Sequence, residues 1–216
     1  MSKSILPSLA LVFALSFVLS SESVIAKTQL GFRAGLNFGN RFADPESDLD
    51  HHGRIGVIAS AVIQGALNNK NTVFIRGEVS FIDRGWYEDA YINDEIVETT
   101  FSTHEIAFGP AIIVRSPSQR LAPFAEVGLE FAAVVRKRAE ATYLGMELSN
   151  DIPEYSTNNI SANLGVGVIL PAKSDEFQAA IRFSPGLKNM IDSKYDITVK
   201  TTGVQLLIGY YFTLKK

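Results

Sequence analysis

The chain has 216 residues, of which 46% are hydrophobic and 20% are charged, and it contains no cysteine. One domain is expected at this length, and the hydrophobic fraction is too high for a disordered chain. Its 20 Lys and Arg residues nearly balance 23 Asp and Glu residues, so there is no electrostatic reason to expect nucleic-acid binding. The lack of cysteine excludes disulfides, cysteine-based metal sites and lipid-anchored cysteines.

The first 26 residues have the pattern of a cleavable signal peptide. Lys3 provides a positive start, Leu9 to Leu19 form a mostly apolar stretch, and Val24-Ile25-Ala26 offers small residues at the positions that signal peptidase recognises. The apolar stretch is about eleven residues long, whereas a membrane-spanning helix needs about 20. We therefore expect cleavage after Ala26, export, and one domain over residues 27–216.

From Leu30 onward, apolar and polar residues alternate at every second position, which is the period of a β-strand. In the first segment, Leu30, Phe32 and Leu36 share one face, and Arg33 and Asn37 share the other. The same alternation predicts eight strands: residues 30–39, 54–64, 73–81, 103–114, 123–135, 160–170, 177–184 and 202–212. Strands of about 9–12 residues suit a tilted crossing of a membrane.

The connections between these strands alternate in length. Long polar connections are predicted at residues 41–53, 85–100, 136–158 and 185–200, and short ones at residues 65–71, 115–121 and 171–176. This alternation is typical of an up-and-down barrel with short periplasmic turns and longer outer loops. The sequence therefore predicts an all-β fold, an eight-stranded antiparallel up-and-down transmembrane β-barrel in the outer membrane, with both termini in the periplasm.

A secreted soluble β-barrel is an alternative, because its strands also alternate, with the apolar face inward. The glycines on the polar face favour the membrane barrel, since glycine weakens a water-facing strand but leaves room for large side chains in a narrow lumen. These glycines are Gly31, Gly35, Gly39, Gly109, Gly128, Gly165 and Gly167. Aromatic residues near strand ends are interpreted as interfacial girdles: Phe38, Trp86, Tyr87, Phe101, Phe124, Phe177, Tyr210 and Phe212.

Charged residues also lie on the polar face, namely Arg33, Arg76, Glu78, Glu105, Glu126, Glu130 and Arg182. The interior of an eight-stranded barrel is only wide enough for side chains to fill it, so charges of both signs are expected to pair there. We predict a packed polar lumen with a structural charge network. A small selective channel stays an alternative, whereas a general-diffusion porin would need about 16 strands.

An outer-membrane lipid-modifying enzyme is a further alternative, because Ser102, His104 and Glu105 include the residue types of an esterase triad. His104 and Glu105 are adjacent on a predicted strand and therefore point to opposite faces, which argues against catalysis. We predict no enzyme, no cofactor and no metal site. The acidic segment with Asp48, Asp50, His51 and His52 matches no metal-binding spacing and is interpreted as a solvated loop.

The segment Arg182-Phe183-Ser184-Pro185-Gly186-Leu187-Lys188-Asn189-Met190 resembles the Arg-Tyr-x-x-Gly-Leu-x-Asn-Ile signature of the PorT-like outer-membrane β-barrel family of Bacteroidetes-type Gram-negative bacteria. Its signature positions are Arg182, Gly186, Leu187 and Asn189. The segment Arg76-Gly77-Glu78-Val79-Ser80-Phe81 is similar to that family's Gln-Pro-Glu-Leu-x-Tyr, with Gly77 in place of proline. The resemblance implies an outer-membrane barrel, in a family with one member known for a part in protein secretion and gliding machinery.

The last predicted strand carries Tyr210 and Phe212, which resemble the C-terminal aromatic signal for assembly of outer-membrane barrels. The predicted partners are outer-membrane lipid, lipopolysaccharide, the barrel-assembly machinery and other envelope or secretion proteins, with no nucleic acid. The predicted function is a non-enzymatic structural or interaction role through the outer loops, or that of a secretion-machinery accessory.

Overall fold

A computed structural model describes residues 27–44, 50–92, 95–117, 120–143, 146–151, 155–191 and 198–214. In these ranges the strands are β1 (Thr28–Asp44), β2 (Asp50–Ala66), β3 (Val73–Ile92), β4 (Glu95–Arg115), β5 (Ala122–Tyr143), β6 (Met146–Asp151), β7 (Asn158–Ala172), β8 (Asp175–Phe183) and β9 (Thr198–Thr213). No helix within the same ranges has the length and hydropathy to cross a membrane. The predicted signal peptide, residues 1–26, lies outside the described residues.

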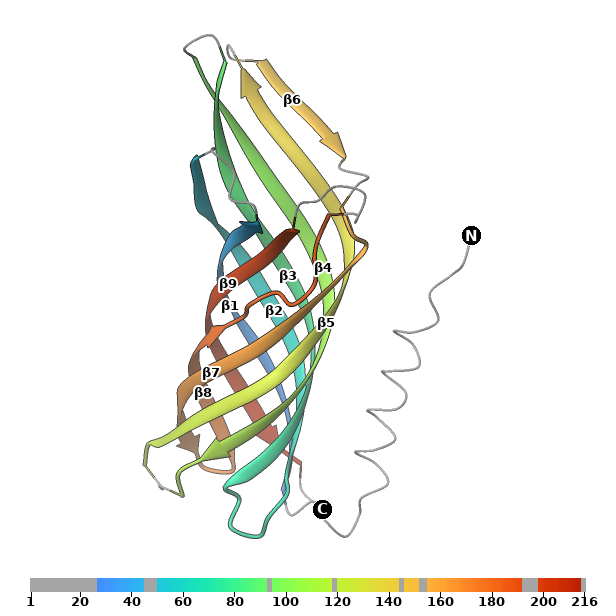
Figure 1. Cartoon of the computed structure of the whole chain (residues 1–216). Helices are drawn as coiled ribbons and strands as arrows, with labels where there is room; N and C mark the ends of the chain where they lie inside the picture. The colour runs from blue at the N-terminus through green and yellow to red at the C-terminus, as the bar shows by residue number, and fades with distance from the viewer. Residues whose placement is uncertain are drawn as a thin grey trace.

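The strands form one antiparallel sheet in the order β4-β3-β2-β1-β9-β8-β7-β5-β6, and pairing of β4 with β5 closes it (Figure 1). Eight strands make the ring, while β6 pairs with β5 alone among the described strands and lies outside the ring. The predicted eight-stranded antiparallel barrel is confirmed. In the ring, β1 lies opposite β5 and β3 lies opposite β8, because three strands separate the members of each pair on either side.

The ring carries its apolar side chains outward and its polar side chains inward. On β1, Phe32 and Leu36 are exposed, whereas Arg33 and Asn37 are buried. A soluble barrel would have the opposite arrangement, because water would face the polar side chains. The structure therefore contradicts the soluble alternative and fits a wall surrounded by lipid.

Two of the predicted inward glycines show why small residues are needed in this lumen. A Cβ atom on Gly165 would lie 2.6 Å from Glu126 Cγ, and one on Gly31 would lie 2.6 Å from Cδ1 of the Tyr211 ring. Such distances are too short for carbon–carbon contacts, so larger residues would displace the side chains opposite. Glycine at these positions lets a narrow barrel hold an inward glutamate and an inward tyrosine.

The strands extend to different lengths at the two ends of the barrel. Short connections join β2 to β3, β4 to β5 and β7 to β8 at one end, and the β3–β4 and β5–β6 hairpins project at the other end (Figure 1). The prediction of a long loop over residues 85–100 is wrong, because β3 continues to Ile92 and β4 begins at Glu95. The predicted connection 136–158 likewise holds the end of β5 and all of β6. Beyond the membrane the outward face of a strand no longer meets lipid, so backbone hydrogen bonding continues while the row of apolar outward residues stops.

The girdle prediction is right for some aromatic residues and wrong for others. Phe38, Phe177 and Phe212 are exposed on the outer wall, but Trp86 is only 1% exposed and Phe124 only 5%. The ring of Phe101 stacks on Trp86 at a centroid distance of 5.2 Å. Trp86, Phe101 and Phe124 are therefore interior residues, because their positions in the strand alternation match those of inward side chains such as Arg84, Glu105 and Glu126.

Trp86 is the only tryptophan of the chain, so its fluorescence tests this placement directly. For the folded protein in vesicles we expect blue-shifted emission that brominated phospholipids and aqueous acrylamide quench weakly, because Trp86 faces the barrel interior. The matched control carries Trp86→Phe and Phe38→Trp, which moves the probe to an exposed outward position. Strong quenching of the control by brominated lipid is expected, and equally strong quenching of Trp86 would contradict an inward indole.

Candidate functional site

Five charged side chains meet in the middle of the lumen and form a central cluster, made of Arg33 on β1, Arg76 and Glu78 on β3, Glu126 on β5 and Arg182 on β8. Glu126 accepts hydrogen bonds from Arg76 Nη1 at 2.6 Å and from Arg182 Nε at 2.7 Å. Glu78 Oε2 accepts hydrogen bonds from Arg182 Nη2 at 2.8 Å and from Arg33 Nη1 at 3.1 Å. All five residues are buried, so each carboxylate is compensated by at least two guanidinium groups.

The central cluster crosses the full width of the barrel. The Arg182–Glu78 ion pair joins β8 to the opposite strand β3, and Arg33 Nη1 on β1 lies 3.5 Å from Glu126 Oε2 on the opposite strand β5. The hydrogen bond of 2.8 Å from Arg76 Nη2 to Gln178 Oε1 also joins β3 to β8. Because these contacts run across the lumen in two directions, side chains occupy its middle.

Uncharged groups complete the surroundings of Arg76. Gln64 Oε1 accepts hydrogen bonds from Arg76 Nε at 3.1 Å and from Nη2 at 2.9 Å. The Tyr211 ring lies below the guanidinium, with 5.4 Å between Cζ and the ring centroid. Every nitrogen of this guanidinium therefore has a hydrogen-bond acceptor, which is what a buried charge requires.

A second group, the upper cluster, lies closer to the long hairpins and consists of Arg84, Glu105 and Glu130. Arg84 Nε donates to Glu105 Oε2 at 3.0 Å, and Arg84 Nη2 donates to Glu130 Oε1. Asn159 Nδ2 donates to Glu105 Oε1 at 3.3 Å. The sequence prediction missed Arg84, although it continues the even-numbered inward positions of β3 from Arg76. Extending the alternation past residue 81 would have found it.

Above the upper cluster, the interior becomes aromatic and forms an outer plug, made of Trp86, Tyr155 and Met190 with Phe101 packed against them. The Trp86 indole Nε1 donates to Glu88 Oε1 at 2.8 Å, and Lys137 Nζ donates to the Tyr155 carbonyl. Burial raises the pKa of the Tyr155 phenol, which therefore stays uncharged at neutral pH. The plug covers the ionic lumen on the side of the long hairpins.

At the short-turn end, Glu176 on β8 gathers two cations. Its carboxylate lies 2.7 Å from Lys27 Nζ and 2.8 Å from Arg115 Nη1. The Arg115 guanidinium also lies over the Phe74 ring, 4.4 Å from its centroid. The lumen is thus lined by paired charges at this end as well as in the middle.

The residues considered for an esterase triad are not assembled. Glu105 is fully buried and bonded to Arg84, whereas His104 Nε2 lies on the outer wall, 3.8 Å from Asp83 Oδ1. Ser102 and His104 share that outward face of β4, and Glu105 does not. Among the described residues, no three or more His, Cys, Asp or Glu side chains gather as a metal site. Asp48 of the acidic segment lies outside those residues.

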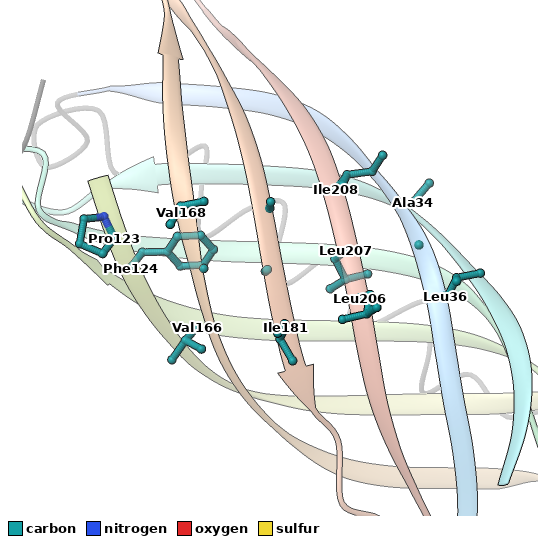
Figure 2. Close-up of a pocket in the computed structure, with 14 residues that line it drawn as sticks. Ala34, Leu36, Pro123, Phe124, Val166, Val168, Ile181, Leu206, Leu207 and Ile208 are labelled. Carbon is teal, nitrogen blue, oxygen red and sulfur yellow. The ribbon is translucent and has the colours of Figure 1, made fainter. Parts of the chain in front are cut away.

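A groove of about 820 Å³ lies on the wall formed by β1, β5, β7, β8 and β9 (Figure 2). Small outward residues such as Ala34 and Ala179 form part of its lining, and larger ones such as Leu36, Ile181 and Ile208 stand beside them. The lining contains no charged residue, and most of its side chains point to the outside of the barrel. The groove therefore belongs to the lipid-facing surface, and its described lining residues offer no polar side chain for chemistry.

The positions of the proposed family signature lie along β9 and in the lumen. Arg182 is part of the central cluster, and the Gly186 amide donates to the Thr201 carbonyl at 2.7 Å. Asn189 Oδ1 accepts from the Val199 amide at 2.8 Å, while Leu187 is exposed. The aromatic residues of the proposed assembly signal, Tyr210 and Phe212, stack edge to face at 4.7 Å on the outer wall.

Comparison with known proteins agrees with this architecture. A family model described as outer membrane protein beta-barrel domain matches residues 20–192. The outer membrane protein OprG of Pseudomonas aeruginosa has a similar structure, with a TM-score of 0.50 and 8% identity, covering 87% of this chain and 97% of OprG. For neisserial surface protein A, NspA, the TM-score is 0.48 and the identity 12%, covering 84% of this chain and 95% of NspA.

The attachment invasion locus protein Ail of Yersinia pestis has a TM-score of 0.41 and 14% identity, covering 86% of this chain and 99% of Ail. At such identities the likeness to solved structures concerns the fold alone. No curated protein sequence is significantly similar to the chain. The family match covers most of the chain and agrees with the lipid-facing ring of strands, so the chain belongs to the outer membrane protein beta-barrel domain family and is an outer-membrane protein.

Proposed function

We propose that this chain is an outer-membrane barrel with a sealed lumen, which acts without catalysis through the strands that project beyond the membrane. The observation that carries the proposal is the pair of ionic contacts across the barrel, Arg182–Glu78 and Arg33–Glu126. A transported solute would have to separate these charges inside a buried environment, and breaking a buried ion pair costs about 3–5 kcal/mol. The lumen therefore serves as a polar core.

The projecting hairpins supply the surface for interaction. In outer-membrane barrels the short turns face the periplasm and the longer loops face outward, so the β3–β4 and β5–β6 hairpins would lie outside the cell. A non-enzymatic role is supported by the outward position of His104 and the buried position of Glu105, which keep the two side chains on opposite faces of β4.

The sealed lumen is tested by conductance in planar bilayers. We expect the folded wild-type chain to give no current steps above the bare membrane. The comparison variant combines Arg33→Ser, Glu78→Ser, Glu126→Ser and Arg182→Ser, which removes both contacts across the barrel and leaves the net charge unchanged. If it folds, shown by a mobility change on boiling, it should conduct. Reproducible current steps from the wild type, with a conductance that changes in the Glu126→Gln variant, would instead establish a selective channel.

A narrower version of the function follows from the PorT-like resemblance, which supports a role as accessory of a secretion complex in the outer membrane. From the sequence we also predict that the barrel-assembly machinery recognises Tyr210 and Phe212, and that residues 1–26 are removed. Co-purification of the tagged chain from intact outer membranes tests the accessory role. Stable envelope or secretion partners are expected, and recovery of the chain alone would favour a freestanding barrel.

A further inference from the structure

Strand β5 contains a bulge that changes which of its side chains face outward. Glu105 on β4 pairs with Val134, but the preceding His104 pairs with Arg136, so Val135 is an extra residue on β5. Before the bulge the even-numbered residues Glu126 and Glu130 face the lumen, and a bulge shifts the alternation by one residue. Beyond it Lys137 points inward to the Tyr155 carbonyl. Arg136 and Arg138 consequently face outward, although an unbroken strand would have directed both into the lumen.

The two arginines lie where the apolar surface of the wall ends. Going toward the long hairpins, the outward residue after Phe81 on β3 is Asp83, and the one after Ile106 on β4 is His104. Asp83, His104 and Arg136 are direct cross-strand neighbours, so the boundary continues across β3, β4 and β5. The apolar stretches of about nine residues below this boundary match the length that crosses the hydrocarbon layer. The boundary therefore lies at the height of the lipid headgroups.

The polar groups at this boundary leave positive charge available. Arg136 is exposed and has no ion pair among the residues that the structure describes, and Arg138 Nη1 lies 2.7 Å from Glu140 Oε1 at a half-exposed position. Asp83 is already paired with Arg54 at 2.7 Å, and it lies 3.8 Å from His104 Nε2. Ser102 is directly opposite Arg138. A guanidinium, a second guanidinium, an imidazole and a hydroxyl thus share one outward patch on β4 and β5.

We propose that this outward patch, Arg136, Arg138, His104 and Ser102, binds a phosphate group of lipid A in the outer leaflet. Arginine forks match phosphate oxygens, and serine and histidine add hydrogen-bond donors. The patch stands directly above Ile106 and Val135, which are exposed and would contact acyl chains of the same molecule. A headgroup of the outer leaflet fits this position better than a phosphate free in solution. The site is independent of whether the lumen conducts.

The test measures binding of purified bisphosphoryl lipid A to the folded full-length chain by native mass spectrometry. EDTA is present, so that divalent cations cannot bridge carboxylates to phosphate. We expect the Arg136→Gln, Arg138→Gln double variant to bind about 10–100-fold more weakly, because it loses both of the cations that donate charge-assisted hydrogen bonds to the phosphate. The single variant Arg136→Gln, which disturbs no ion pair of the described part of the chain, should show a smaller loss in the same direction.

Lys200→Gln is the matched control, since it removes a cation at the same end of the barrel from β9. It should change the affinity for lipid A less than about twofold, because an exposed charge outside the patch contributes little to binding. Equal losses in Lys200→Gln and Arg136→Gln, or no loss in the double variant, would overturn the site. Phosphatidylglycerol serves as a second probe. Binding of this lipid as tightly as lipid A, with the same dependence on the two arginines, would overturn the assignment to lipid A.

Discussion

Replacing Glu126 with glutamine is expected to destabilise the folded barrel by about 3–5 kcal/mol. The carboxylate accepts hydrogen bonds from Arg76 and Arg182, and it also lies 3.5 Å from Arg33. An amide of the same size has one accepting oxygen and no charge, so Glu78 would be the one carboxylate of the central cluster left to compensate three buried guanidinium groups. Urea unfolding in lipid vesicles, followed by the fluorescence of Trp86, measures the loss as a lower midpoint.

Glu140→Gln is the matched control for this prediction. Glu140 forms an ion pair of the same length, 2.7 Å to Arg138, but the two side chains are 49% and 37% exposed. Exposed pairs contribute about 0–1 kcal/mol, so the unfolding midpoint should hardly move. A similar shift of the unfolding midpoint in both variants would mean that burial does not determine how much an ion pair stabilises this barrel. No shift in Glu126→Gln would mean that the lumen around Glu126 is wetter than its 4% exposure indicates.

The barrel itself was predictable because the membrane imposes a strict alternation on the sequence. Lipid requires apolar residues at every second position of a spanning strand, and the closed ring satisfies all backbone hydrogen bonds. The predicted stretch 73–81 consequently lies within β3, and the pairing of Val79 with Phe108 follows the outward face of neighbouring strands. The alternation also places Arg76 and Glu78 on the same inward face.

The strands beyond the membrane were not predictable in the same way. Residues 83–92 of β3 continue the ladder with β4, but their outward face no longer meets lipid, so no row of apolar outward residues marks them. Arg84 and Trp86 lie in this part, and both were missed as interior residues. The bulge at Val135 is a further limit, since an extra residue leaves no compositional trace and reverses the orientation of every residue that follows.

The upper cluster differs from the central cluster in its charge balance. The central cluster has three guanidinium groups and two carboxylates, whereas Arg84 alone faces both Glu105 and Glu130. Across the two clusters, four arginines balance four glutamates. The central cluster therefore has an excess of positive charge, and the upper cluster has an excess of negative charge. The stability of the barrel should consequently depend most strongly on the single arginine of the upper cluster.

Replacing Arg84 with methionine should therefore destabilise the barrel by about 3–5 kcal/mol, because two buried carboxylates lose the one arginine that pairs with them among the described residues. The triple variant Arg84→Met, Glu105→Gln, Glu130→Gln removes the carboxylate charges as well, and we expect it to recover most of the loss, since a buried ionic group replaced as a whole is often close to neutral. Urea unfolding of wild type, single and triple variants in the same vesicles measures both effects.

The comparison of the single and triple variants separates charge from shape. If the triple variant were as unstable as Arg84→Met, the packing of the arginine stem against its neighbours would be the main contribution, and the charges of Glu105 and Glu130 would matter little. If the triple variant recovers its stability, compensation of charge is the main contribution of Arg84 to the stability of the upper cluster. The Asn159 amide, which donates to Glu105 at 3.3 Å, could then donate equally to the carbonyl oxygen of a glutamine at that position.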